Sequence, residues 1–223
     1  MSFALDAFNY LRMPVKFKRF YFCYKNQEFN LLDVGCGYGS PRKTMKYFKL
    51  CNYYGIDREY SGNDEIDFKL MRRFIKIDLD TEGLDDVPND FFDVILFSHV
   101  IEHLQNGIRV LSDLVNKLKP GGVIYIEFTG MGSFSAPSGK TSSLHFCDDS
   151  SHVKVYPLHD IINVLLDKRL KIIKAGTRRD VVRLFMTPLL VVRGIVMGNL
   201  SGLELWDLIG FADYVYAQKA KSR

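Results

Sequence analysis

Three glycines at alternate positions, Gly35, Gly37 and Gly39, could bind a ligand through the main chain. Glycine reaches backbone angles closed to other residues and lets a ligand approach without a Cβ in the way. The spacing differs from the G-x-G-x-x-G fingerprint of dinucleotide-binding turns, because Ser40 occupies the sixth position. Asp33, just before the turn, would repel a pyrophosphate and attract an ammonium or sulfonium group. The pattern therefore predicts a turn that binds a cationic ligand.

A second acid, Asp57, ends an apolar segment that we expect to be a strand, residues 53–57. It follows the glycine turn by about 20 residues, where a carboxylate can accept hydrogen bonds from both hydroxyls of a ribose. Residues 74–79 alternate as another strand and include a third acid, Asp78. The position of Asp57 therefore predicts a ribose-binding carboxylate at the end of its strand.

His99 follows a fully apolar segment, residues 91–97, which is typical of a central parallel strand. Ligands in open α/β sheets bind at the carboxyl ends of strands, so His99 is a candidate catalytic residue. We expect His103, one helical turn on, to pack against or orient the loop. Glu102 lies between them without the H-E-x-x-H spacing of a zinc helix, so we expect no metal site.

Two further histidines, His145 and His152, bracket Asp148 and Asp149. A histidine can remove the proton from an acceptor hydroxyl, and we take His152 as the first candidate base and His145 as the second, oriented by one of the aspartates. Two alternatives stay open. The same groups could bind Mg²⁺, or the aspartates could cap the helix that we expect to begin near Pro157.

The expected elements place these residues at strand ends. Residues 29–34 predict a buried strand, and Ser40 is a plausible N-cap with Pro41 at the first helical position. We expect a polar loop over residues 61–70 and a helix stop at K-P-G-G, residues 119–122. The other expected elements are helices at 42–50, 108–118 and 158–167, and strands at 123–128, 170–174 and 211–219.

Several stretches, taken in order, resemble the class I S-adenosylmethionine-dependent methyltransferases of small-molecule type. They are L-L-D-V-G-C-G-Y-G, the strand ending in Asp57, F-D-V-I-L-F-S-H-V-I-E-H-L and L-K-P-G-G, and the resemblance covers residues 30–128. It implies an α/β fold: a Rossmann-like, doubly wound sheet of seven mostly parallel strands, an antiparallel last strand and helices on both faces. It also implies S-adenosyl-L-methionine (SAM) as cofactor.

The resemblance implies roles for individual residues. Asp78 and the main-chain N–H of Leu79 would bind the adenine amine, and Ser98 and His99 would border the methionine part and the acceptor. Arg58 would lie near the adenine or face solvent. The residues expected to bind the cofactor are Asp33, Gly35, Gly37, Gly39, Asp57, Arg58, Asp78, Leu79, Ser98 and His99.

The stretch 144–156 is similar to N-F-Y-D-D-x-T-H-V in methyltransferases that modify sugars and cell-surface glycans. It predicts O-methyl transfer to a hydroxyl of a sugar or glycan precursor. The alternatives are a quinone-like or lipophilic acceptor, and a non-catalytic SAM-binding protein. We do not expect a nucleic-acid substrate, because the net charge is only +4 and no N-P-P-Y motif is present.

The chain has 223 residues, 47% hydrophobic and 25% charged, which predicts one soluble domain over residues 1–223. Four cysteines without a C-x-x-C pair indicate reduced thiols and a cytoplasmic protein, a monomer or a homodimer. Residues 1–28, rich in aromatic and basic side chains, predict a helical lid or cap. Residues 178–210 predict a helical insertion: a lid, a dimer face or a peripheral membrane contact. Its apolar part carries two arginines and a proline, so we expect no transmembrane segment.

Overall fold

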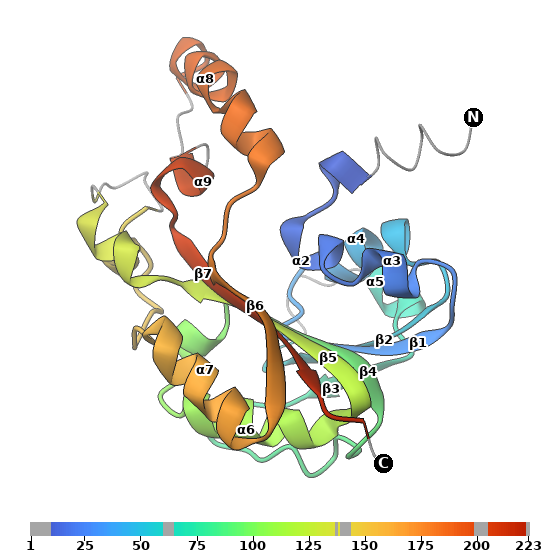
Figure 1. The fold of residues 1–223 in the computed structure, drawn as a ribbon. Coiled ribbons are helices and arrows are strands. Elements are labelled where there is room, and N and C mark those ends of the chain that lie inside the picture. The colour runs from blue at the N-terminus through green and yellow to red at the C-terminus, as the bar shows by residue number, and fades with distance from the viewer. Residues whose placement is uncertain (1–9, 60–64, 137, 139–143, 199–204, 222–223) are drawn as a thin grey trace.

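The protein folds around one seven-stranded sheet with helices on both faces (Figure 1). The structure is a computed structural model and describes residues 10–59, 65–136, 138, 144–198 and 205–221. The strands are β1 (Phe29–Val34), β2 (Cys51–Asp57), β3 (Arg73–Lys76), β4 (Phe92–Ser98), β5 (Leu118–Thr129), β6 (Leu170–Thr177) and β7 (Ala212–Lys219). Their order is β3-β2-β1-β4-β5-β7-β6, and β7 runs antiparallel to both of its neighbours. This confirms the predicted Rossmann-like fold.

Helices form two layers, one on each face of the sheet (Figure 1). One layer holds α6 (Gly107–Lys117) and α7 (Leu158–Asp167). The other holds α2 (Val15–Lys18), α3 (Tyr21–Tyr24), α4 (Ser40–Tyr47) and α5 (Glu65–Leu70). Between β6 and β7 the chain forms α8 (Val181–Val196) and α9 (Trp206–Ile209), and the short 3₁₀ helices are η1 (Ile101–His103), η2 (Met131–Ser135) and η3 (Phe146–Asp148).

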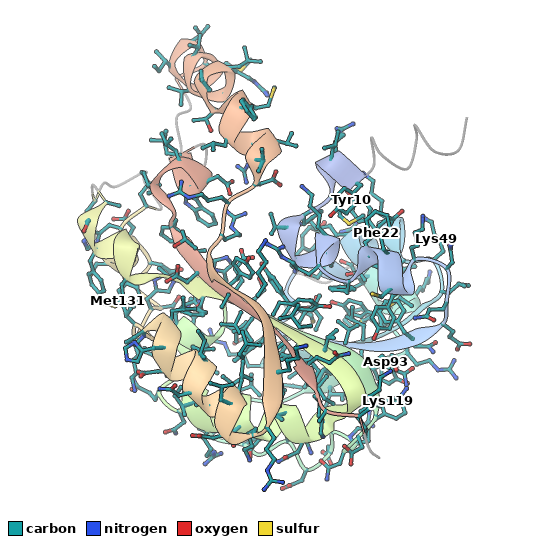
Figure 2. All side chains as sticks on the ribbon, in the orientation of Figure 1. Tyr10, Phe22, Lys49, Asp93, Lys119 and Met131 are labelled. Carbon is teal, nitrogen blue, oxygen red and sulfur yellow. The ribbon has the colours of Figure 1, made fainter. Side chains whose placement is uncertain are left out.

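Alternation along the strands divides the core into two apolar clusters. In β1, Leu32 packs with Leu111 of α6 and Leu165 of α7, whereas Leu31 packs with Phe17 and Phe48 on the opposite face. Successive side chains of a strand point to opposite faces, so a one-residue shift in register would exchange the two sets. Figure 2 shows the side chains that fill the space between the sheet and the helices on each of its faces.

The aromatic N-terminal segment packs onto the sheet rather than standing apart from it. Phe17 and Phe20 are buried, and their rings lie 5.6 Å and 5.0 Å from that of Phe48. Tyr10 and Phe22 lie side by side at the surface, 5.0 Å between ring centroids (Figure 2). Residues 10–28 thus form two short helices with a shared aromatic core. Residues 1–9 of the predicted cap lie outside the described residues.

Two local predictions were wrong, and a third, the helix stop at K-P-G-G, is correct for the end of α6 but missed the strand that this stretch forms. Gly39, not Ser40, is the N-cap of α4, because its left-handed backbone (φ 73°) turns the chain into the helix. Residues 65–70 form α5 instead of a loop. The K-P-G-G stretch belongs to β5, whose first residue Leu118 already pairs with Phe92 of β4. In that stretch, Gly122 has no room for a Cβ, because backbone carbonyl oxygens lie within 3.2 Å of its position.

A helical insertion was predicted between the sixth and last strands, and α8 and α9 confirm it in the described part. Residues 199–204 of the predicted insertion lie outside that part. The aspartates of residues 148–149 do not cap the helix near Pro157, because Pro157 is the N-cap of α7 and no side chain caps it.

Candidate functional site

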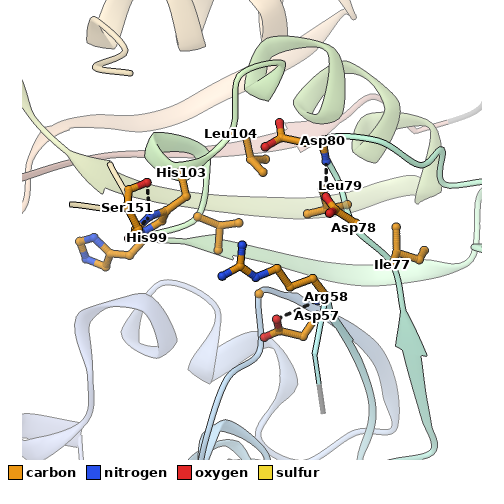
Figure 3. Close-up of a pocket in the computed structure, with 12 residues that line it drawn as sticks. Asp57, Arg58, Ile77, Asp78, Leu79, Asp80, His99, His103, Leu104 and Ser151 are labelled. Atoms are coloured by element: carbon orange, nitrogen blue, oxygen red, sulfur yellow. Dashed lines mark hydrogen bonds between the residues drawn. The ribbon is translucent and has the colours of Figure 1, made fainter. Parts of the chain in front are cut away.

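A cavity of about 310 Å³ lies at the carboxyl ends of the strands (Figure 3). It sits where β1 and β4 are neighbours but lead to strands on opposite sides of the sheet, which is the switch point where ligands bind in such folds. Of the residues expected to bind the cofactor, those that line it are Gly35, Asp57, Arg58, Asp78, Leu79 and His99.

The glycine turn is adapted to close approach of a ligand. Gly35 has φ 67°, and a Cβ there would lie 2.3 Å from Val100 Cγ2. The N–H of Gly37, with φ 50°, donates to Asp57 Oδ2 at 3.0 Å, and the N–H of Arg58 donates to Asp57 Oδ1 at 2.8 Å. The turn and the second-strand acid are therefore joined in one cradle, as the sequence predicted.

The cradle has a buried anchor that the sequence prediction missed. Asp67 of α5 is fully buried and accepts a hydrogen bond from the N–H of Gly39 at 3.1 Å. Its other oxygen lies 3.0 Å from Arg42 Nε on α4. The flanking apolar residues Ile66 and Phe68 were the available hint that this acid belongs to a packed helix rather than to a loop.

Asp33 lies beneath the turn instead of in the cavity. Its carboxylate is buried and accepts a hydrogen bond from the Tyr53 hydroxyl at 2.7 Å. Burial raises its pKa, whereas the charge of Lys16 and the bond from Tyr53 lower it. Asp33 lines none of the described cavities, so the expected direct contact with a cationic ligand is not what the geometry provides.

Asp78 caps a turn at the edge of the first cavity. Its Oδ1 accepts the N–H of Asp80 at 3.0 Å, which caps a turn, and its residue also lines the cavity beside Leu79. In Figure 3, Arg58 extends between Asp57 and the segment that carries Asp78. Ser98 lies elsewhere and lines a cavity of about 610 Å³ on the side of the N-terminal segment.

A second cavity, of about 480 Å³, adjoins the first and shares His99 and His103 with it. Most of its lining residues have polar side chains, although the wall itself is about equally polar and apolar, and His145, His152 and the aspartates between them lie along it. Trp206 and Phe211 form an aromatic wall, stacked with ring centroids 4.5 Å apart. A group held in the first cavity can therefore react with a molecule held in the second.

His99 is clamped between two buried carboxylates. Its Nδ1 lies 3.2 Å from Glu102 Oε1 and its Nε2 lies 3.0 Å from Glu127 Oε1. Burial lowers its pKa, but the hydrogen bonds and charges of both glutamates outweigh this and raise it to about 9. At neutral pH the ring is an imidazolium that donates from both nitrogens. It has no lone pair with which to act as a base.

The two distal histidines differ in the nitrogen that they leave available. His152 Nδ1 lies 2.8 Å from the Phe146 carbonyl oxygen and must donate to it, so the neutral ring carries its lone pair on Nε2. His145 Nδ1 instead accepts the N–H of Cys147 at 3.1 Å, which places the proton of its neutral ring on Nε2. Both line the second cavity, but only His152 offers a basic Nε2.

His103 was expected only to orient the loop, yet it lines both cavities. Its Nδ1 lies 3.2 Å from the Ser151 carbonyl oxygen, to which it donates, so its Nε2 is also available. One ligand atom each from His103, Asp149 and His152 lie within 4.8 Å of one another. This trio is the group in the described residues that could hold a divalent metal.

Glu102 contributes a buried oxygen without a partner. Its Oε1 accepts the N–H and the hydroxyl of Thr129 at 3.1 Å and 2.9 Å and faces His99. Its Oε2 is buried and has no hydrogen-bond partner among the described residues. Because a buried unpaired carboxylate oxygen is costly and Glu102 lines the second cavity, a ligand that donates a hydrogen bond would fit there.

Comparison with known proteins supports the class of SAM-dependent methyltransferases. A family model described as a methyltransferase domain matches residues 6–174. The chain is 31% identical over 103 residues to a ubiquinone biosynthesis O-methyltransferase of Rickettsia bellii, a match that spans 45% of this chain but only 42% of that protein. It is 26% identical over 194 residues to ajmaline N-methyltransferase of Rauvolfia serpentina, spanning 81% and 66% of the two chains.

The fold has close counterparts among solved structures. A SAM-dependent methyltransferase from Archaeoglobus fulgidus superposes with a TM-score of 0.55 at 21% identity, covering 97% of this chain and all of that one. The chain therefore belongs to the methyltransferase-domain family, with the fold of the class I SAM-dependent enzymes. Its cofactor is S-adenosylmethionine, and the glycine cradle that a Cβ would fill fits this group.

None of the described helices is both long enough and apolar enough to cross a bilayer.

Proposed function

We propose that the protein transfers a methyl group from SAM to a hydroxyl oxygen of a small-molecule acceptor bound in the second cavity, with His152 as general base. The observation that carries this proposal is the orientation of His152. Its Nδ1 donates to the Phe146 carbonyl oxygen, which fixes the tautomer and presents the Nε2 lone pair to the cavity. This is the geometry that a general base requires.

SAM supplies a methyl group on a sulfonium, ready for in-line displacement. The protein's contribution is alignment, because holding the acceptor oxygen and the methyl carbon at near-attack distance removes much of the entropic barrier. His152 takes the hydroxyl proton on Nε2 as the oxygen attacks. Asp149, whose Oδ2 lies 3.8 Å from that nitrogen, then stabilises the imidazolium. A hydrogen bond from Ser151 lowers the pKa of Asp149 and keeps it ionised.

The polar side chains of the cavity favour a polyhydroxylated acceptor such as a sugar. Glu102 Oε2 can accept from one hydroxyl, and Asp148 and Asp149 lie on the same wall. The stacked rings of Trp206 and Phe211 give the apolar face of a sugar ring a flat surface. Pockets that combine an aromatic wall with a few placed polar groups bind ligands in a fixed orientation.

A lipophilic acceptor is the second candidate. The names of the relatives include ubiquinone biosynthesis O-methylation and ajmaline N-methylation, and the helix α8 next to the aromatic wall is strongly apolar. A panel of sugars, sugar nucleotides and quinol analogues, each with labelled SAM, separates the two candidates. Turnover with any acceptor argues against a non-catalytic SAM-binding protein.

The base is tested with the accepted substrate by three substitutions. We expect His152→Gln to lower kcat about 10²- to 10⁴-fold with SAM affinity unchanged. His159→Gln is the matched control, because His159 is exposed on α7 and pairs only with Asp160. Full turnover by His152→Gln together with loss in His103→Gln would move the base to His103. Loss of turnover in excess EDTA, restored by Mg²⁺ or Mn²⁺, would instead favour a metal on the His103–Asp149–His152 trio.

A further inference from the structure

The helix α8 turns its apolar side to solvent. Residues spaced four, four, three and four apart share one helix face, and here they are all apolar. Their exposed fractions are 61% for Val181, 82% for Phe185, 61% for Leu189, 58% for Val192 and 80% for Val196. We name these five residues the α8 stripe.

The face of α8 that packs toward the protein carries the polar and small residues. Thr187 and Gly194 are buried there, and Arg183 lies 3.6 Å from the buried carboxylate of Asp207 on α9. A helix at the surface of a globular protein normally has the opposite arrangement, with apolar residues inward. The α8 stripe is therefore built to contact something outside the described chain.

Charge around the stripe selects the kind of partner. Between Val181 and Gly198 the chain has no acidic residue, and it has two arginines, Arg183 and Arg193. Arg193 is exposed and, at helical spacing, lies beside Leu189 at the edge of the stripe. Arg183 faces the protein, so Arg193 is the arginine at the edge of the stripe. Apolar residues with an arginine at their edge and no acid among them match an anionic lipid surface, where basic side chains meet headgroups and apolar ones enter the acyl boundary.

The position of α8 agrees with that partner. Figure 1 shows α8 projecting beyond the sheet. A cavity at the first turn of α8 is lined by the basic residues Arg12, Lys16 and Lys43 together with Val182 and Arg183. Basic side chains of the N-terminal segment and of α4 thus lie near the base of α8.

We propose that α8 is an interfacial helix that seats the protein on an anionic membrane, with the α8 stripe inserted among the lipids and Arg193 against the headgroups. Sixteen residues make a helix of about 24 Å, which is ample for lying in the interface plane. α9, which packs against α8, carries Trp206 of the second cavity wall. Docking would therefore bring the acceptor cavity close to the lipid headgroups. The proposal does not depend on which acceptor is used.

The test is flotation of the full chain with two kinds of vesicle. One contains phosphatidylcholine alone, and the other also contains roughly 30–40% phosphatidylglycerol. We expect binding to the anionic vesicles that weakens as salt is raised. The triple variant Phe185→Gln/Leu189→Gln/Val196→Gln should bind at least about tenfold more weakly, and Arg193→Gln should lose the preference for anionic lipid. The matched control Leu166→Gln/Ile173→Gln removes exposed apolar side chains from α7 and β6 and should bind like the wild type.

Two measurements keep the outcome interpretable. SAM affinity of the triple variant should equal that of the wild type, which shows that the variant is folded. Amide exchange across Val181–Val196 in the wild type should slow when anionic vesicles are added, a readout that needs no variant. The proposal is overturned if the wild type does not bind anionic vesicles, or if the triple variant binds equally well. A wild-type dimer that the triple variant makes monomeric, without vesicle binding, would assign the stripe to a second copy of the chain.

Discussion

At the scale of single residues, two positions of the site have a left-handed backbone. Gly35 has φ 67°, and Val100 leaves no room for a Cβ there. His99 has φ 55°, which strains a residue with a Cβ, and hydrogen bonds to two glutamates hold its side chain. Strained backbone is retained where the surrounding contacts over-determine it. Both residues border the first cavity.

Replacing Gly35 by alanine should destabilise the fold and weaken SAM binding together. The positive φ alone costs about 1–3 kcal/mol for a residue with a Cβ, and the overlap with Val100 adds to it. We expect a loss of that order in the free energy of unfolding by urea titration, and at least about tenfold weaker SAM binding by calorimetry.

Gly132→Ala is the control for that substitution, because the nearest atom to its Cβ would be 3.6 Å away and its φ is not in the left-handed region. Normal SAM affinity in Gly35→Ala would show that the turn does not approach the cofactor.

The clamp on His99 gives folding stability a defined pH dependence. Its folded-state pKa of about 9 lies above the ordinary value of 6.5, so protonation stabilises the folded protein. This contribution is complete below about pH 6.5 and is lost as pH rises through about 9. We expect the difference in unfolding free energy between the wild type and His99→Gln to shrink over that interval in denaturant titrations. A difference that does not change with pH would mean that the ring is neutral in the folded protein.

At the scale of elements, α5 holds the glycine turn in place from outside it. Asp67 of α5 accepts a hydrogen bond from the N–H of Gly39 and pairs with Arg42 of α4. The position of the glycine turn therefore depends on a helix that contributes no residue to the cavity wall.

Asp67→Asn should reveal this dependence. The variant loses a charge-assisted hydrogen bond and the charge that Asp67 presents to Arg42, which we expect to cost about 2 kcal/mol in unfolding free energy and to weaken SAM binding. Glu65→Gln on the same helix is the matched control, because its pair with Lys69 is exposed and should be worth under about 1 kcal/mol. Thermal unfolding and calorimetry of both variants make the comparison, and equal effects would remove the anchoring role.

The sequence predicted helices and strands well where the hydrophobic periodicity and the turn-forming residues indicated the same element. The strand at residues 29–34 and the following glycine turn are local patterns, and both were confirmed. It failed where a distant partner decides the outcome. The sequence places Asp67 in a polar loop, but in the fold Asp67 accepts a hydrogen bond from the N–H of Gly39. The sequence also predicts that Asp33 contacts a ligand, but in the fold Asp33 is hydrogen-bonded to the Tyr53 hydroxyl.

The same limit applies to the histidines. From the sequence, His152 was the first candidate base and His145 the second, and His99 was a separate candidate at a strand end. The tautomer of each depends on main-chain atoms or carboxylates that only the fold brings near, such as the Phe146 carbonyl beside His152. The role of Trp206 was likewise invisible, because the aromatic wall forms only when α9 folds back beside Phe211.

At the scale of the whole molecule, charged pairs join the N-terminal segment, the insertion and the site. Lys18 of α2 lies 3.1 Å from Asp180, whose N–H donates to Asp207 of α9 at 2.7 Å. Arg178 lies 3.5 Å from Asp207 and 3.3 Å from Glu127, the carboxylate that clamps His99. These pairs thus connect the N-terminal segment and the insertion to the residues around the cavities.

A ligand that binds the folded protein and not the unfolded chain stabilises the fold, and we expect this of SAM. At 100 times its dissociation constant, a ligand adds about 2.7 kcal/mol, which corresponds to a rise of roughly 5–10 °C in Tm for a chain of this size. We expect this shift with SAM and none with NAD, measured by differential scanning fluorimetry. Asp57→Ala should abolish the shift, and a shift that survives this substitution would place the cofactor elsewhere.

The position of β7 has a consequence for synthesis. This strand lies between β5 and β6 and pairs with both. Because β6 is joined to the sheet by β7, it cannot pair until β7 has been synthesised, some 40 residues later. On the ribosome, β6 must wait with its edge unpaired while α8 and α9 emerge. A nascent chain at that stage exposes an open strand next to an apolar helix, and chaperones that bind such surfaces would have their greatest effect there.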